Sequence, residues 1–156
     1  MEGILETSLF EERAVDFFMK GYNCSQAVYA AFVPVLDVEE KDALRIASAF
    51  GGGFGRLRHV CGAFSGITLV LGHFFGYDDP SDEKKDTLYP RVQELSRRFE
   101  KTCGSIICRE ILNNKVPVGG VPSPRTKEYY ESRPCARVVG WAAKILEEYL
   151  REEGCL

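Results

Sequence analysis

Six cysteines are the residues of this sequence best suited to chemistry, because a thiolate can act as a nucleophile, a redox group or a metal ligand. They are Cys24, Cys61, Cys103, Cys108, Cys135 and Cys155. Six among 156 residues are too few for a disulfide-stapled scaffold. Residues 1–6 lack the basic and apolar segments of a signal peptide. We therefore expect a cytoplasmic, reducing setting, which favours metal binding or redox chemistry over structural bridges.

Three of the cysteines lie where the sequence predicts helices to begin. Cys24 follows a capping asparagine, Cys61 begins an apolar segment, and Cys135 follows Pro134, which suits the first position of a helix. Unpaired N–H groups and the positive end of the helix dipole lower the pKa of a thiol at such a position. The three cysteines are therefore candidate thiolates, although a buried cysteine can also be a simple core residue.

The other cysteines are harder to place. Cys103 and Cys108 lie about 140° apart around a helix, so one intact helix cannot aim both at one ligand. If one of them acts, the other is a bystander. Cys155 lies one residue from the end of the chain and is interpreted as incidental. No C-x-x-C pair is present, which argues against a thioredoxin-type motif and a typical zinc knuckle.

Cations and histidines near the cysteines add weaker signals. Arg56, Arg58 and His59 lie just before Cys61, and positive charge there favours a thiolate. His59 could act as a base or ligand, but a plain loop residue is the better interpretation. His73 lies in an apolar segment and is interpreted as a core residue with satisfied hydrogen bonds. The sequence has no H-E-x-x-H motif and no evident catalytic base, which weakens a hydrolase interpretation.

The elements that must position these residues are predicted to be helices, since apolar residues recur at three- and four-residue steps and no segment alternates like a strand. Residues 113–124, with three prolines and two glycines, are predicted to form a loop, and residues 127–133 are ambiguous. A helix start or a kink is expected at Pro90. We expect helices over Leu9–Gly21, Asn23–Pro34, Asp37–Phe50, Cys61–Gly76, Asp82–Lys101, Cys103–Leu112 and Cys135–Glu152. The predicted fold is all-α, a single compact bundle of five to seven helices spanning residues 1–156.

Glycines are expected to let backbones approach one another. Gly51–Gly55 lacks the lysine and the preceding strand of a nucleotide-binding loop, so we interpret it as a helix break that allows a close approach. Gly62 and Gly66 share one helical face, and so do Gly72 and Gly76. Both pairs are predicted to mark close helix crossings. The crossing at Gly62 and Gly66 would bring Cys61 against a neighbouring backbone.

Charge and hydropathy limit the partners. The net charge of −3, from 20 basic and 23 acidic residues, argues against a nucleic-acid partner. Residues 60–76 are apolar but short and glycine-rich for a membrane span, so a buried helix is expected. A redox partner is expected, although no pattern identifies it. The Phe and Tyr content is compatible with a homodimer, and nothing in the sequence requires one.

The cysteines also occur in a recognisable order of motifs. The segments involved are GYNCSQAV at 21–28, FGGG at 50–53, Cys-Gly-Ala-x-x-Gly at 61–66, GSIICREIL at 104–112 and Pro134-Cys135. This order resembles the C_GCAxxG_C_C family of redox-active proteins over about residues 10–150. The resemblance implies that the four family cysteines are Cys24, Cys61, Cys108 and Cys135, and that Cys103 and Cys155 lie outside the pattern.

The resemblance also implies a setting and a cofactor. Similar helical modules occur in split-Soret-type cytochromes, which implies an iron–sulfur role for the four cysteines. The chain has no C-x-x-C-H motif and therefore no covalent haem site. Family members are typical of anaerobic bacteria and archaea, often beside transporter genes, so an anaerobic source is implied.

Three classes of function remain open. In the first, ranked slightly ahead, Cys24, Cys61, Cys108 and Cys135 bind an iron–sulfur cluster or another thiophilic metal for electron transfer. Four thiols are one pair more than dithiol cycling needs. In the second, one pair cycles between dithiol and disulfide, with Cys61 as nucleophile and Cys24 as its resolving partner. In the third, the chain is a non-catalytic helical binding module. The sequence does not choose between an oxidoreductase and an electron-transfer protein.

Overall fold

A computed structural model describes residues 8–156, and residues 1–7, on which the signal-peptide prediction rests, lie outside the described part. Within residues 8–156, six helices have eight or more residues, which agrees with the five to seven predicted. They are α2 (Leu9–Met19), α3 (Cys24–Ala31), α4 (Glu40–Ala47), α6 (Gly62–Phe75), α7 (Lys85–Cys103) and α10 (Cys135–Glu152). The all-α prediction is confirmed, since these residues contain no strand.

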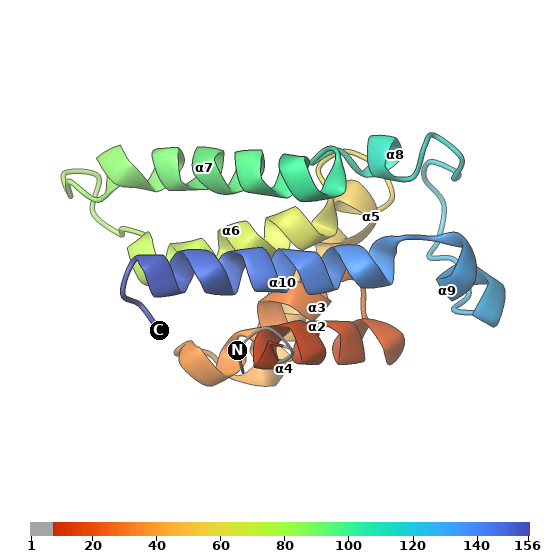
Figure 1. Cartoon of the computed structure of the whole chain (residues 1–156), viewed down its shortest axis with the longest axis horizontal. Coiled ribbons are helices and arrows are strands. Elements are labelled where there is room, and N and C mark those ends of the chain that lie inside the picture. Colours follow the sequence, from red (N-terminus) through yellow and green to blue (C-terminus); the bar gives the residue numbers. More distant parts are fainter. Residues whose placement is uncertain (1–7) are drawn as a thin grey trace, which may run out of the picture.

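Shorter elements connect the long helices. They are α5 (Gly51–Phe54), α8 (Cys108–Ile111), α9 (Lys127–Ser132) and the 3-10 turns Val33–Val35 and Ser48–Phe50. Figure 1 shows α7 along one edge of the molecule, α6 and α10 in the middle, and α2, α3 and α4 along the other edge. The short helices α5, α8 and α9 gather at one end. In the described part of the chain, no helix is both long and apolar enough to cross a membrane.

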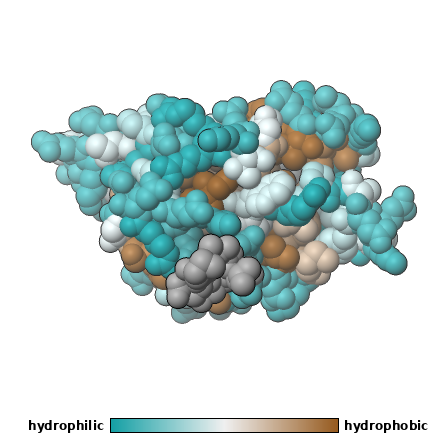
Figure 2. Space-filling view, in the orientation of Figure 1, coloured by the Kyte–Doolittle hydropathy of each residue, from teal (hydrophilic) through white to brown (hydrophobic). Residues whose placement is uncertain are grey.

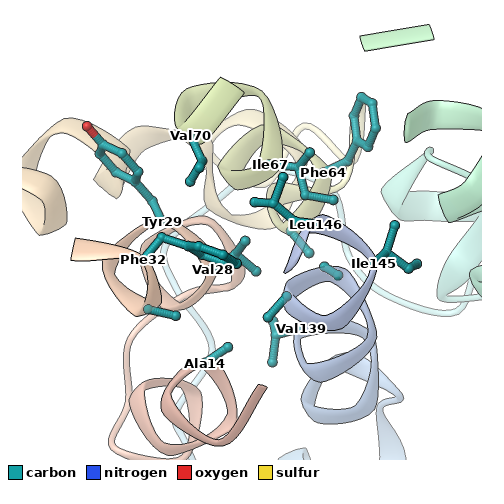
Figure 3. Close-up of a cluster of buried hydrophobic side chains, with 14 of the residues drawn as sticks. Ala14, Val28, Tyr29, Phe32, Phe64, Ile67, Val70, Val139, Ile145 and Leu146 are labelled. Atoms are coloured by element: carbon teal, nitrogen blue, oxygen red, sulfur yellow. The ribbon is translucent and has the colours of Figure 1, made fainter. Parts of the chain in front are cut away.

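The core lies where α10, α3, α6 and α2 meet (Figure 3). Val28, Ile67 and Leu146 are fully buried at the centre of this cluster. Ala14 on α2 is also fully buried, and its small side chain lets neighbouring helices approach. The face seen in Figure 2 is mostly hydrophilic with small scattered hydrophobic patches, as expected when each helix buries one apolar stripe. The assignment of residues 1–156 to one domain stays a prediction.

The start of α3 follows the predicted capping box. The Asn23 side chain accepts a hydrogen bond from the Gln26 backbone N–H at 2.9 Å, and the Gln26 side chain accepts one from the Asn23 N–H at 3.0 Å. The two bonds satisfy donors that the first turn of a helix leaves free. This cap fixes the position of Cys24 as the first residue of α3.

Some predicted boundaries are wrong. The helix expected over Cys103–Leu112 does not form, because Gly104 has a left-handed backbone (φ 93°) and ends α7 at Cys103. A new helix begins only at Cys108. Helix α7 also continues through Pro90 to its end. The ambiguous segment 127–133 contains the short helix α9, and Pro134 precedes α10 instead of beginning it.

One of the two predicted glycine crossings is confirmed. A Cβ atom on Gly66 would lie 2.8 Å from Cβ of Val28, and one on Gly62 would lie 3.3 Å from Cβ of Cys24. The first half of α6 therefore packs closely on α3. The second prediction is wrong: a Cβ on Gly72 would meet nothing within 4 Å, and one on Gly76 would meet only its own helix.

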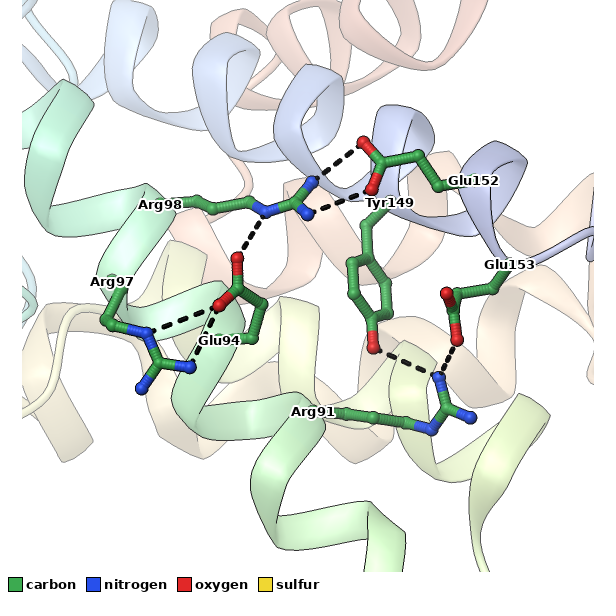
Figure 4. A network of polar contacts seen from close by, with 7 residues as sticks. All are labelled: Arg91, Glu94, Arg97, Arg98, Tyr149, Glu152 and Glu153. Atoms are coloured by element: carbon green, nitrogen blue, oxygen red, sulfur yellow. Dashed lines mark hydrogen bonds and ion pairs between the residues drawn. The ribbon is translucent and has the colours of Figure 1, made fainter.

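Away from this crossing, α7 and α10 are joined by a network of charged side chains (Figure 4). Arg98 binds both carboxylate oxygens of Glu152 at 2.9 and 3.0 Å and also contacts Glu94 at 2.8 Å. Arg91 donates a hydrogen bond to the Tyr149 hydroxyl at 3.0 Å and pairs with Glu153. Each of these arginines therefore has a carboxylate partner.

Candidate functional site

Four cysteines line a single cavity of about 50 Å³: Cys24, Cys61, Cys108 and Cys135. Each lies at a helix start, since three are the first residues of α3, α8 and α10, and the fourth directly precedes α6. Cys103 and Cys155 do not line the cavity. Sequence spacing alone missed the helix start at Cys108, and the signal that could have found it is Gly104, a residue that often ends a helix.

The glycine run at 51–55 places two of these cysteines. Gly52 and Gly53 both have a φ of 69°, so α5 is a left-handed turn that residues with side chains adopt only at a cost. A Cβ on Gly53 would lie 2.6 Å from the backbone nitrogen of His59 and 2.8 Å from Cβ of Cys108. The predicted close approach therefore exists, and it brings residues 58–60 against α8.

Backbone hydrogen bonds fix the two segments together. The Cys108 N–H donates to the His59 carbonyl at 2.6 Å, and the Cys61 N–H donates to the Ile106 carbonyl at 2.6 Å. Between these two bonds, Val60 and Ile107 form an isolated β-bridge. The pairing holds the start of α6 beside the start of α8. It therefore positions the Cys61 and Cys108 side chains at one side of the cavity.

Cys24 and Cys135 are the two thiols of the site that interact with one another by a hydrogen bond. The hydrogen bond between them raises the pKa of the Cys24 thiol well above its usual range and lowers the pKa of Cys135. The positive charges of Arg133, Arg125 and Arg58 lower the pKa of Cys135 further. Both cysteines are half-buried. Of the two thiols, Cys135 is therefore the one that loses its proton more readily.

The other two cavity cysteines are buried and stay protonated. Cys61 is 6% exposed, and burial raises its pKa to about 12 although the Ala63 and Phe64 N–H groups lower it. Burial also raises the pKa of Cys108, against the effect of Arg58, whose Nη1 lies 3.8 Å from its sulfur. The predicted lowering of a thiol pKa occurs at Cys135, but its causes are the contact with Cys24 and the positive charge of nearby arginines. The prediction of a lowered pKa is wrong for Cys61, because burial raises the pKa of this thiol. It is also wrong for Cys24, because the hydrogen bond with Cys135 raises its pKa.

The predicted helpers of Cys61 have other roles. Arg56 donates to the Gly119 carbonyl and to the Ser123 hydroxyl, both at 2.7 Å, so it holds the proline-rich loop. His59 is exposed and enters the site only through its backbone. His73 is exposed as well, with its Nε2 2.6 Å from the Tyr29 hydroxyl. The interpretation of His73 as a core residue is therefore wrong, although its ring does have a hydrogen-bond partner.

Three arginines complete the cavity: Arg58, Arg125 and Arg133. Arg58 is 3% exposed, and its Nε donates to the Pro117 carbonyl at 3.0 Å. Arg125 donates to the backbone carbonyls of two residues near the end of α2, at 2.9 and 3.2 Å. The sequence analysis missed Arg125 and Arg133. Arg125 lies between the proline-rich segment and α9 and belongs to no motif. The position of Arg133 two residues before Cys135 was an available signal.

The donor atoms do not converge as a metal centre. Residues 8–156 contain no group of three or more His, Cys, Asp or Glu side chains arranged to hold a metal ion. The four sulfurs share a cavity, but in this arrangement they do not surround one point at metal–sulfur distances. No carboxylate lines the cavity either. A metal ion or cluster would therefore require the cysteine side chains to move toward one another.

The chain was compared with known proteins. A family model described as "Putative redox-active protein (C_GCAxxG_C_C)" matches residues 22–149. This match covers most of the chain, so the protein belongs to the C_GCAxxG_C_C family of redox-active proteins, and the resemblance seen in the sequence is confirmed. The matched range contains all four cavity cysteines and excludes Cys155. Searches of curated proteins and of solved structures found no match.

Proposed function

We propose that the protein transfers two electrons by thiol–disulfide exchange, with Cys135 as the attacking thiolate and Cys24 as the resolving thiol. The observation that carries this proposal is that Cys24 and Cys135, at the starts of α3 and α10, line one cavity with three arginines, where their mutual contact and the positive charge lower the pKa of Cys135. A lowered pKa increases the fraction of thiolate at a given pH, and the thiolate is the form that attacks a disulfide. The partial exposure of both residues gives a substrate access to them.

Reduction of a disulfide substrate takes two steps. The Cys135 thiolate attacks one sulfur of a disulfide substrate, which forms a mixed disulfide and releases the other sulfur as a thiolate. Cys24 then loses its proton to solvent and attacks the Cys135 sulfur, which releases the second substrate sulfur. The protein dithiol is oxidised to a disulfide, and the substrate disulfide is reduced to a dithiol. The reverse reaction oxidises a substrate dithiol.

This assignment differs from the pair expected from the sequence. Cys61, the predicted nucleophile, is buried with a pKa of about 12, so almost none of it is ionised at neutral pH. Cys24 keeps its predicted resolving role. Cys61 and Cys108 line the same cavity as neutral thiols, with Arg58 beside the sulfur of Cys108.

Disulfide mapping tests the proposal. The reduced protein is incubated without oxygen with one equivalent of a small disulfide, quenched in acid, alkylated and analysed by peptide mass spectrometry. We expect a bond between Cys24 and Cys135, lost in Cys24→Ser and in Cys135→Ser. Cys155→Ser is the matched control and should still form it. A bond that joins Cys61 to Cys108 instead, or no intramolecular bond, would overturn the proposal.

A second candidate is the binding of a thiophilic metal or an iron–sulfur cluster, favoured by the four thiols that line one cavity. Cys24, Cys61, Cys108 and Cys135 would hold it, and the cavity arginines would offset the negative charge of the thiolates. A bound iron–sulfur cluster would supply one-electron transfer there. Visible absorption with iron, zinc and sulfide analysis of protein purified without oxygen tests this candidate. Absorption bands that disappear in Cys61→Ala would support it, and colourless, metal-free protein with four reactive cavity thiols would exclude it.

A further inference from the structure

A larger cavity of about 250 Å³ adjoins the cysteine cavity. The two share six lining residues, among them the side chains of Arg58, Arg125 and Arg133. A fourth arginine, Arg56, lines the larger cavity, and no Asp or Glu lines either one. The chain as a whole is acidic, with a net charge of −3. The larger cavity, lined by four arginines and no carboxylate, is therefore a positively charged site on an acidic protein.

These arginines have only neutral partners. Arg56, Arg58 and Arg125 donate to backbone carbonyls, at distances between 2.7 and 3.2 Å. Within residues 8–156, none of the four cavity arginines forms an ion pair with a carboxylate. Four arginines elsewhere in the chain do: Arg91, Arg97, Arg98 and Arg151. No carboxylate of the described residues thus compensates the charge of the cavity arginines.

One guanidinium atom has no partner at all. Nη2 of Arg58 is buried without a hydrogen bond, and the residue is 3% exposed. An unsatisfied buried donor on a charged group is destabilising, so such an atom is rare unless a ligand satisfies it. The described residues contain two other buried polar atoms without partners. One belongs to a neutral serine, and the other to Arg91, which already pairs with Glu153.

The arginines also lie close to one another. The guanidinium carbons of Arg125 and Arg133 lie 4.8 and 4.3 Å from the centre of the same ring, that of Tyr129. Like charges around one ring repel, and the repulsion is larger in a partly buried site than in water. A bound anion removes this repulsion. Guanidinium groups suit oxyanions in particular, because their paired N–H groups match two oxygens of one anion.

We propose that the two adjoining cavities form a binding site for a tetrahedral oxyanion, held by Arg58, Arg125 and Arg133 beside the Cys24–Cys135 pair. The ligand is sulfate, phosphate or the phosphate group of a small organic molecule. Nη2 of Arg58 supplies the free donor. The volume of the larger cavity leaves room for an organic group attached to the anion. This site does not depend on which thiol chemistry the cysteines perform.

Calorimetric titration with inorganic sulfate and phosphate tests the site, with chloride at equal ionic strength as the reference. We expect saturable binding that weakens at least about tenfold in Arg133→Gln and Arg58→Met. Arg97→Gln, which removes an exposed arginine of the α7–α10 network, is the matched control and should bind like the unaltered protein. If Arg58→Met does not fold, Arg133→Gln decides, since the Arg133 side chain is half-buried and stacks only on Tyr129.

Two further arms identify the ligand and separate this site from the thiol chemistry. Glycerol 3-phosphate that binds more tightly than inorganic phosphate supports an organic ligand, and equal binding supports the free ion. A Cys24→Ser, Cys135→Ser double variant should still bind the anion, so failure of disulfide exchange leaves this proposal standing. Titrations that show no saturable heat above chloride, or equal binding in Arg133→Gln, would overturn it.

Discussion

Two arginine-rich regions of this molecule use the same side chain in opposite ways. Between α7 and α10, Arg98 lies between two carboxylates and Arg91 pairs with Glu153, so charge joins two long helices (Figure 4). At the cysteine cavity, Arg58 and Arg133 have no carboxylate partner among the described residues. The first region stabilises the fold. In the second, we propose that the positive charge serves the Cys135 thiolate and a bound anion.

The backbone turn beside the cysteine cavity is tightly constrained, and the largest expected effect comes from there. Gly53→Ala should lower the free energy of unfolding by about 3 kcal/mol, because its Cβ would meet backbone in a left-handed turn. Gly72→Ala is the control on an open helix face and should gain about 0.5 kcal/mol. Chemical denaturation measures both. Similar values for the two variants would show that the turn at the cavity is not constrained.

The buried thiol of Cys61 should make stability depend on alkaline pH. Its pKa is raised from 9.0 to about 12 in the folded protein, so the unfolded chain loses this proton first. The stabilisation is complete below pH 9 and is lost as the pH rises toward 12, at about 1.4 kcal/mol per pH unit. Denaturation between pH 8 and pH 10 should show a smaller loss in Cys61→Ala than in the unaltered protein. Equal slopes would place Cys61 in contact with water or with a positive charge.

Matched substitutions compare the arginines of the two regions directly. Arg98→Gln should lower stability by about 1 kcal/mol, because it breaks contacts with two carboxylates, and high salt should reduce the difference. Arg133→Gln should change stability by about 0.5 kcal/mol or less, because the lost contact with the Tyr129 ring is offset by reduced repulsion. Thermal or chemical melts measure both. A larger loss in Arg133→Gln would mean that the cavity arginines mainly stabilise the fold.

Local signals predicted the parts of this structure that local physics decides. The capping box at Asn23, the packing of Gly62 and Gly66 on a neighbouring helix, and the break at 51–55 follow from short stretches of sequence. The all-α class follows from periodicity. The helix start at Cys108 was missed because residues 103–112 were interpreted as one helix, although Gly104 ends the helix before it.

Features that depend on long-range contacts could not be predicted. The pKa of Cys61 depends on its burial, which raises it. Its position at a helix start alone predicts a lowered pKa, which is the wrong direction. Arg125 reaches the cavity from a loop that lies about a hundred residues along the chain from the carbonyls it contacts. The choice of Cys135 as partner of Cys24 likewise depends on the packing of α10 beside α3. A sequence pattern shows none of these distances.

The rate of alkylation of each cysteine as a function of pH tests the central claim most directly, since it measures which thiol is ionised. Peptide mass spectrometry after short pulses of iodoacetamide gives a rate for each site. We predict that Cys135 reacts first, with a midpoint below its usual 9.0, and that Cys24→Ala raises this midpoint because it removes the hydrogen bond. Faster reaction of Cys61, or a Cys135 midpoint unchanged by Cys24→Ala, would contradict the account.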